Sequence, residues 1–119
     1  MNIKHMTSIK VPKPLHYKMQ QQIISDGYGM RGKSKWLIEA IETFLSLPDF
    51  PWLVDLAEGM DQLGEIVSVR LPEDTLLKLD QAVIAVRKVY PAMEGVKSHL
   101  IRASIMQRLI RSPASVTEV

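Results

Sequence analysis

Two short stretches, Ser8-Ile9-Lys10-Val11-Pro12 and Ser68-Val69-Arg70-Leu71-Pro72, share one pattern at a spacing of 60 residues. In each stretch a serine and a basic residue alternate with aliphatic residues, and a proline ends the run. Because successive side chains of a strand point to opposite faces, this alternation predicts strands with one apolar and one polar face. We expect the two strands to pair with each other and the rest of the chain to support the pair.

Two helical segments follow the first predicted strand. Pro14 suits the first turn of a helix, and the apolar residues after it recur every four positions. Turn residues at 26–29 separate this helix from a second one, which we expect to start at Gly32-Lys33-Ser34 and to end before Pro48. The apolar stripes comprise Leu15, Met19 and Ile23 in the first helix and Leu37, Ala40, Ile41, Phe44 and Leu45 in the second.

The same order of segments returns in the second half of the chain. We expect Glu73 or Asp74 to cap a helix, residues 91–95 to break it, and Lys97-Ser98 to open a last helix. The strands align at an offset of 60 residues and the second helices at an offset of 64, which indicates a tandem repeat. The apolar stripes comprise Leu76, Leu79, Val83, Val86 and Tyr90, then Ile101, Ile105 and Leu109.

The repeat predicts a fold class. A unit of about 45 residues with a single strand leaves backbone groups unpaired and buries little core, whereas two units satisfy both needs. We therefore expect a mainly α protein with a two-stranded antiparallel β-ribbon, in which tandem repeats form an intramolecular pseudo-dimer. A dimer that exchanges repeats between two chains fits the same pattern. The expected segments are a first repeat at 1–47, an acidic, partly helical connector at 48–65, a second repeat at 66–111 and a disordered tail at 112–119.

The net charge of +2 is unevenly distributed. Residues 1–47 hold seven basic and three acidic side chains, residues 48–65 hold five acidic and no basic ones, and residues 66–119 hold eight basic and five acidic ones. Two basic segments around an acidic connector suit a polyanionic partner. The chain has no cysteine, no signal-peptide pattern and no run near the roughly 18 apolar residues of a membrane span. We expect a cytoplasmic protein without a membrane partner.

The sequence contains no catalytic or metal-binding pattern. His5, His16 and His99 lack ligand spacing, and neither a glycine-rich phosphate loop nor a nucleophile elbow is present. We therefore expect neither an enzyme nor a metal or other cofactor. Trp36 and Trp52 are interpreted as anchors of the core or the connector rather than as platforms that stack on bases.

A strand ending in proline, a helix, a glycine-containing turn and a helix opened by Lys33-Ser34 or Lys97-Ser98 together resemble a ribbon-helix-helix unit of the Arc, MetJ and CopG superfamily. The resemblance covers roughly residues 6–47 and 66–111, and two units in series resemble the tandem members of that superfamily, among them a conjugation protein. It implies a sequence-specific double-stranded DNA-binding protein whose ribbon enters the major groove. The implied role is that of a transcriptional repressor or of an accessory factor in plasmid transfer.

The resemblance also implies which residues touch DNA. Outward strand positions face base edges, where Arg or Lys can donate to guanine O6 and N7, and Ser can donate or accept. The N-terminus of each second helix anchors a phosphate, because its free N–H groups and the helix dipole favour an anion. Met6 and Ile66 either contact thymine methyl groups or pack against the connector. The expected base contacts are Met6, Ser8, Lys10, Ile66, Ser68 and Arg70, and the expected phosphate contacts are Gly32, Lys33, Ser34, Lys35, Lys97, Ser98 and His99.

A second interpretation makes the chain a protein-interaction module or an antitoxin-like adaptor. Its docking surface would be the acidic connector with Phe50, Trp52 and Leu53, and the polar face of the ribbon would be only a solvated surface. A second copy of the chain, bound side by side on DNA, is a further expected partner.

Overall fold

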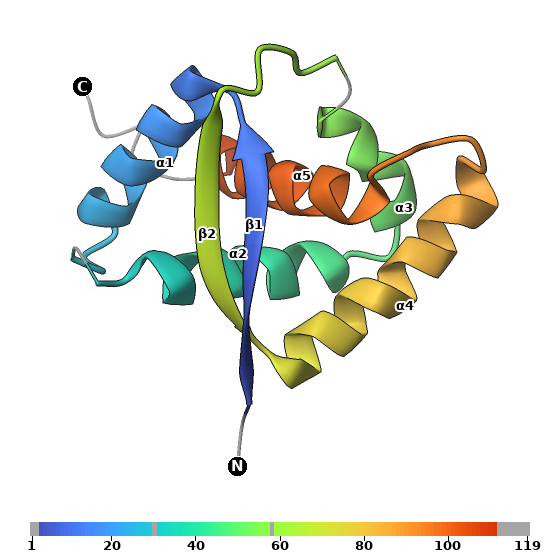
Figure 1. Cartoon of the computed structure of the whole chain (residues 1–119), viewed down its shortest axis with the longest axis horizontal. Helices are drawn as coiled ribbons and strands as arrows, with labels where there is room; N and C mark the ends of the chain where they lie inside the picture. Colours follow the sequence, from blue (N-terminus) through green and yellow to red (C-terminus); the bar gives the residue numbers. More distant parts are fainter. Residues whose placement is uncertain (1–2, 30, 58, 112–119) are drawn as a thin grey trace.

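In the computed structural model, which describes residues 3–29, 31–57 and 59–111, one strand and two helices are followed by a connector, a second strand and two more helices (Figure 1). The protein is mainly helical with a two-stranded antiparallel sheet, as the sequence predicts. The tail at 112–119, predicted to be disordered, lies outside the described residues. The elements are β1 (Lys4–Val11), α1 (Lys13–Ser25), α2 (Lys33–Leu45), α3 (Phe50–Leu53), the 3-10 helix η1 (Val54–Ala57), β2 (Glu65–Pro72), α4 (Glu73–Val89) and α5 (Val96–Ile110).

The ribbon pairs β1 with β2 along their whole length. Ser8 lies opposite Ser68, and the pairing runs to Lys4 opposite Pro72 at one end. Both strands begin before the quoted stretches, β1 at Lys4, four residues before Ser8, and β2 at Glu65, three residues before Ser68. Pro72 is tolerated as the last residue of β2 because each strand of a two-stranded ribbon has a free edge.

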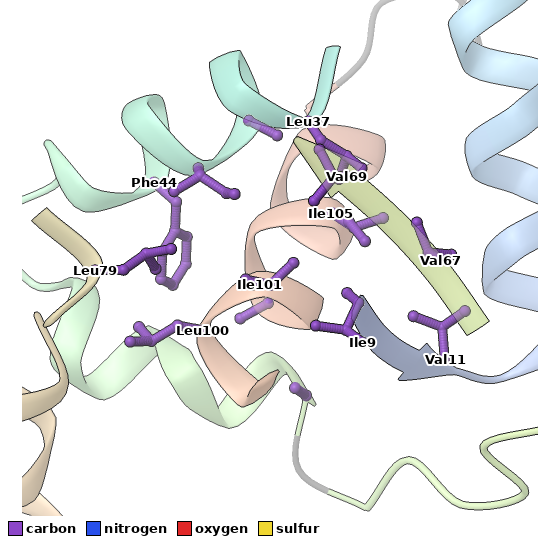
Figure 2. Packing of buried hydrophobic residues seen from close by; sticks show 14 of the residues in the cluster. Ile9, Val11, Leu37, Phe44, Val67, Val69, Leu79, Leu100, Ile101 and Ile105 are labelled. Atoms are coloured by element: carbon purple, nitrogen blue, oxygen red, sulfur yellow. The ribbon is translucent and has the colours of Figure 1, made fainter. Parts of the chain in front are cut away.

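The inner face of the ribbon covers α2 and α5. Figure 2 shows Ile9 and Val69 beside Ile105 and Ile101 of α5 and Leu37 of α2. In Figure 1 both strands cross in front of α2 and α5, and α1 and α4 lie on either side of the ribbon. The side chains of the ribbon that are buried in this core are Ile9, Val11, Val67, Val69 and Leu71.

The burial of α1 agrees with its predicted stripe, because Leu15, Met19 and Ile23 are all buried. In α4 only two residues of the predicted apolar stripe, Leu79 and Val86, are buried, and two residues outside the stripe, Thr75 and Ala82, are buried with them. Thr75 is 1% exposed, and its hydroxyl donates to Glu42 Oε2 of α2 at 2.8 Å. A polar side chain can be buried when a hydrogen bond satisfies it. A search for regularly spaced apolar residues does not detect such a position. Buried in α4 are Thr75, Leu79, Ala82 and Val86, whereas Leu76, Val83 and Tyr90 are only half-buried.

The starts of the two C-terminal helices differ slightly from prediction. Pro72 occupies the position before α4, and neither Glu73 nor Asp74 caps the helix, since both lie within its first turn. Helix α5 starts at Val96, one residue before Lys97, after Gly95 in the left-handed conformation with φ of 63°. Glycine adopts this conformation without the clash of a Cβ atom, so it determines where the preceding loop turns into the helix.

The connector folds onto the helices through α3 and η1. Val54 and Ala57 are buried, and the ring centroid of Phe50 lies 6.2 Å from that of Phe44 in α2. Tyr90 at the end of α4 donates its hydroxyl hydrogen to Asp55 at 2.8 Å. The connector is therefore part of the packed structure rather than a loose linker.

The two tryptophans lie in opposite environments. Trp36 is fully buried in the core, as predicted, but Trp52 in α3 is 57% exposed. The interpretation of Trp52 as an anchor is therefore wrong. Phe50 and Leu53 of the same short helix are partly buried against the core, whereas the Trp52 side chain stays mostly exposed.

Arg108 joins α5 to the turn between α1 and α2. Its guanidinium carbon lies 4.6 Å from the centre of the Trp36 ring and 5.4 Å from that of Tyr28. Arg108 also donates to the Trp36 carbonyl at 2.9 Å and lies 3.6 Å from Asp26 and 3.4 Å from Glu39. Cation–π contacts and two carboxylates thus stabilise a cation at the boundary between the two halves of the chain.

Replacing Glu42 with glutamine is expected to lower stability in a pH-dependent way. The hydrogen bond from Lys78, 2.6 Å away, lowers the pKa of Glu42 below its usual 4.5. A pKa that is lower in the folded state contributes stability above the unfolded value, and this contribution disappears as pH falls through the folded value. Urea unfolding should therefore show Glu42→Gln to be less stable than wild type at pH 7, and the gap should close towards pH 3.

The exposed Glu94 offers a matched control for this prediction. Glu94→Gln should unfold like wild type at both pH values. If the difference in stability between Glu42→Gln and wild type were the same at both pH values, the effect could not be assigned to the ion pair.

Candidate nucleic-acid interface

The outer face of the ribbon presents three cross-strand pairs of side chains. Met6 is 59% exposed and Ile66 is 63% exposed, so neither packs against the connector, which was one of the two expectations for them. Each apolar residue lies opposite a basic one, and two serines lie between these pairs. The pairs are Met6 with Arg70, Ser8 with Ser68 and Lys10 with Ile66.

The centre of this face is tied together by a hydrogen bond between Ser8 Oγ and Ser68 Oγ, at 3.0 Å. On either side of it, Lys10 and Arg70 are exposed. Within the part of the chain that the structure describes, neither of these two side chains forms a salt bridge. Their charges are therefore available to an external partner.

The start of α2 lies against β2. The Arg70 backbone N–H donates to Ser34 Oγ at 3.4 Å. Gly32 is buried, and its N–H donates to the Gly29 carbonyl at 3.2 Å. The first intrahelical donor is Trp36, which bonds to the Gly32 carbonyl at 2.9 Å. The backbone N–H groups of α2 that have no acceptor within the helix are therefore those of Lys33, Ser34 and Lys35.

The two lysines at the start of α2 differ in environment. Lys33, the first residue of the helix, is half-buried. Lys35 is exposed, and its ammonium group lies 5.8 Å from the centre of the Tyr28 ring. Both remain close to the free N–H groups of the first turn, where a positive side chain adds to the attraction for an anion.

The start of α5 lies beside α4 and β1. Lys97 forms a salt bridge with Asp80 of α4 at 3.4 Å, so part of its charge is compensated within the protein. Ser98 is half-buried in the first turn, and His99 Nδ1 lies 3.2 Å from the Gly95 carbonyl oxygen. Of the residues expected to contact phosphate at this end, Ser98 and His99 are those without an acidic partner among the described residues.

Arg102, which the sequence patterns do not single out, links α5 to β1. Its Nη1 donates to the Lys10 carbonyl at 2.9 Å, directly behind an expected base contact. The signal was present, since a charged residue interrupts the apolar run from Leu100 to Ile105. A charge in such a run needs a specific reason to be there.

The arrangement suits a ligand that is extended and negatively charged. Hydrogen-bonding and cationic side chains lie along a narrow exposed ribbon, and a helix N-terminus approaches each strand. Among the described residues no cluster of His, Asp or Glu could hold a metal ion. No helix in those residues has the length and apolar character needed to cross a membrane.

Comparison of the chain with models of protein families, with curated proteins and with solved structures finds no match in any of the three. The functional conclusion therefore depends on the geometry and the chemistry of the ribbon and of the helix termini beside it.

Proposed function

We propose that this chain is a sequence-specific double-stranded DNA-binding protein of the ribbon-helix-helix type, in which the two halves form a pseudo-dimer within one chain. The ribbon enters the major groove, and its outward side chains contact base edges. The observation that most supports the proposal is the exposed outer face, where Lys10 and Arg70 flank the Ser8–Ser68 hydrogen bond and form no salt bridge with any described residue. A two-stranded ribbon fits the width of the major groove, and these side chains can bond to the bases displayed there.

The strand register supports the internal pseudo-symmetry. An offset of 60 residues relates the first pattern to the second, and the register places Ser8 opposite Ser68, its own counterpart. A two-fold rotation about this pair would place each residue of one strand on its counterpart in the other strand. Lys10, two residues after Ser8, and Arg70, two residues after Ser68, therefore occupy equivalent positions. A homodimer with a two-fold axis through the ribbon has the same relation between its strands.

The helices follow the same correspondence. Helices α1 and α4 begin at the same offset of 60, at Lys13 and Glu73. At the offset of 64, buried residues of α2 correspond to buried residues of α5, and each of these helices approaches the strand of the other half. The four extra residues lengthen α4, which has 17 residues against 13 in α1. The corresponding buried pairs are Trp36 with Leu100, Leu37 with Ile101, Ala40 with Ser104 and Ile41 with Ile105.

Selection of bound duplexes from a random-sequence library tests the proposed function. We expect enrichment of one site, and tighter binding to it than to random duplex. On both duplexes log K should fall with log salt at a slope of about −0.9 per phosphate contacted. Because the two strands differ at Lys10 and Arg70 and at Met6 and Ile66, the site of one molecule should be asymmetric. If no sequence were enriched at low salt, the proposed function would be contradicted. If the selected site were strictly two-fold symmetric, the proposal that the two strands of one molecule recognise the bases of that site would be contradicted.

One observation favours the second candidate function, a protein-interaction module. Trp52 is 57% exposed on an acidic segment, and large aromatic side chains are enriched at protein interfaces. Phe50 and Leu53, however, are half-buried against the helices, so the docking surface is smaller than the sequence suggests. If no duplex were bound in the selection experiment, Trp52 would be the place at which to look for a protein partner.

Self-association on DNA is supported by exposed apolar pairs on both outer helices. Tyr17 and Ile24 of α1 are 60% and 69% exposed, and Leu77 and Ile84 of α4, at the offset of 60, are 56% and 60% exposed. Helix α1 holds two lysines and no acidic residue, whereas the first eight residues of α4 hold three acidic residues and one lysine. The α1 side of one copy therefore complements the α4 side of the next, and the titration of longer duplexes should be cooperative.

A further inference from the structure

The pairing pattern of the ribbon places the backbone groups of its outward-facing residues at the two outer edges. The Glu73 N–H donates to the Ile3 carbonyl at 3.0 Å, one step beyond the pair of Lys4 and Pro72. Hydrogen-bonded and non-hydrogen-bonded pairs alternate along an antiparallel ladder. Counted from this bond, the three outward-facing pairs are all of the non-hydrogen-bonded kind. Their N–H and C=O groups therefore point away from the partner strand.

Side chains of α2 and α5 bond to these edges at the two basic residues of the outer face. Arg102 Nη1 of α5 donates to the Lys10 carbonyl at 2.9 Å. On the other edge the Arg70 N–H donates to Ser34 Oγ of α2 at 3.4 Å. Both groups lack a partner across the ribbon, so each bond satisfies a free edge. The backbone beneath each basic side chain is therefore held by the second helix of the other half of the chain.

The two edge contacts differ in strength. The guanidinium of Arg102 is charged and the residue is only 6% exposed, and hydrogen bonds from a charged donor are stronger than those between neutral groups. Its Nη2 lies 3.4 Å from His99 Nδ1 in the first turn of α5, which helps to orient the group. The bond to Ser34 is longer and joins two neutral groups. The backbone at Lys10 is therefore held more firmly than the backbone at Arg70.

Arg102 contributes little to stability for a residue so deeply buried. Its Nε has no hydrogen-bond partner, and no carboxylate forms a salt bridge with it within the described residues. Replacing an incompletely compensated buried charge with an apolar side chain is often neutral or stabilising. At the offset of 64 the corresponding residue of α2 is Ile38, which packs against the core without a charge. What Arg102 supplies is therefore the position of β1 rather than stability.

We propose that Arg102 is a positioning residue for base recognition, which acts by fixing the backbone from which the Lys10 side chain leaves the ribbon. A lysine side chain is flexible, so its ammonium group meets one particular base only when its backbone is held in place. In this role Arg102 contacts no base and acts through Lys10. The inference rests on the proposed function.

The test measures affinity for the selected duplex and for two duplexes with one base pair replaced, at the position read by Lys10 or at the position read by Arg70. These positions are those at which Lys10→Ala and Arg70→Ala no longer discriminate. Arg102→Met should reduce discrimination about tenfold at the Lys10 position and less than about twofold at the Arg70 position. Ser34→Ala, the matched change on the other edge, should leave the Lys10 position unchanged. Equal losses at both positions in Arg102→Met, or no loss at either, would overturn the proposal.

A double-mutant cycle shows whether Arg102 acts through Lys10. In the Lys10→Ala background, Arg102→Met should have no further effect on discrimination. In urea unfolding Arg102→Met should be at least as stable as wild type, which separates a loss of positioning from a loss of structure. A further loss of discrimination in the double variant would mean that Arg102 acts independently of Lys10, and would overturn the assignment.

A measurement without DNA tests the contact itself. The NMR chemical shift of the Lys10 carbonyl carbon responds to the loss of a hydrogen bond to its oxygen. Arg102→Met should move this shift more than that of any other carbonyl in β1, and Arg111→Met, which removes an equal charge from the exposed end of α5, should not move it. An unchanged shift in Arg102→Met would overturn the contact, and a changed shift with intact discrimination would overturn the positioning role.

A second variant keeps the test valid if Arg102→Met fails to fold. Arg102→Lys retains the charge but loses the planar guanidinium, so it should lower discrimination at the Lys10 position and leave the Arg70 position unchanged. Equal effects of Arg102→Lys at the two positions would count against the proposal. Failure of the proposed function would look different, because wild type itself would then not discriminate between duplexes.

Discussion

Replacing Lys10 and Arg70 together with alanine should abolish discrimination between the selected site and random duplex. Each basic side chain that contacts a base contributes about 1–3 kcal/mol to specific binding. The two residues lie four positions apart along the paired strands, about 13 Å at the rise of a strand, so their effects should add to about 2–6 kcal/mol. Binding to random duplex should weaken much less, since that affinity comes mainly from phosphate contacts.

The matched control for this variant removes two exposed positive charges that lie away from the ribbon. Arg87 and Lys88 are exposed in the last turn of α4. The double alanine variant at these positions should lower the affinity for both duplexes slightly and leave their ratio unchanged. The ribbon would not be the reading surface if both double variants lost affinity equally on both duplexes.

Replacing Trp36 with alanine should give the largest loss of stability among these substitutions, about 3–5 kcal/mol in urea unfolding. The side chain is fully buried, and its Nε1 donates to Asp26 Oδ2 at 2.8 Å. Its ring also lies against the Arg108 guanidinium. Truncation therefore creates a cavity and weakens the contact between α5 and the turn of the first half.

Trp52 provides the control, because the same substitution there removes an exposed ring. Trp52→Ala should change the free energy of unfolding by no more than about 0.5 kcal/mol, as expected for a surface position. Similar losses at the two tryptophans would contradict the core that the structure describes.

The strands and most of the helices could be predicted from the sequence because their signals are local. Alternation around Ser8 and Ser68 indicates strands, and apolar spacing together with Pro14 and Gly95 indicates helices. The exposure of Lys10 and Arg70 follows from the same alternation. Only the pairing register, which joins residues 60 positions apart, required the repeat as an additional observation.

The remaining features depend on contacts between distant segments. Nothing near Trp36 or Trp52 in the sequence tells which of them is buried, because burial depends on how α3 and α2 pack. Thr75 is buried because Glu42 of another helix accepts its hydrogen bond. Arg102 is buried because it packs beside β1, where its Nη1 donates to the carbonyl of Lys10, 92 residues away in the chain. The two ends of the ribbon therefore look more alike in sequence than they are in structure.

The most direct test of a ribbon that reads bases in the major groove is to replace the guanines of the selected site one at a time with 7-deazaguanine or inosine. The first lacks the N7 acceptor of the major groove, and the second lacks the amino group of the minor groove. We predict that wild type loses affinity at specific 7-deazaguanine positions and at no inosine position. The affinity of Arg70→Ala should not change when 7-deazaguanine replaces the guanine that Arg70 contacts. Sensitivity to inosine alone, or equal sensitivity of wild type and Arg70→Ala at every position, would contradict the account.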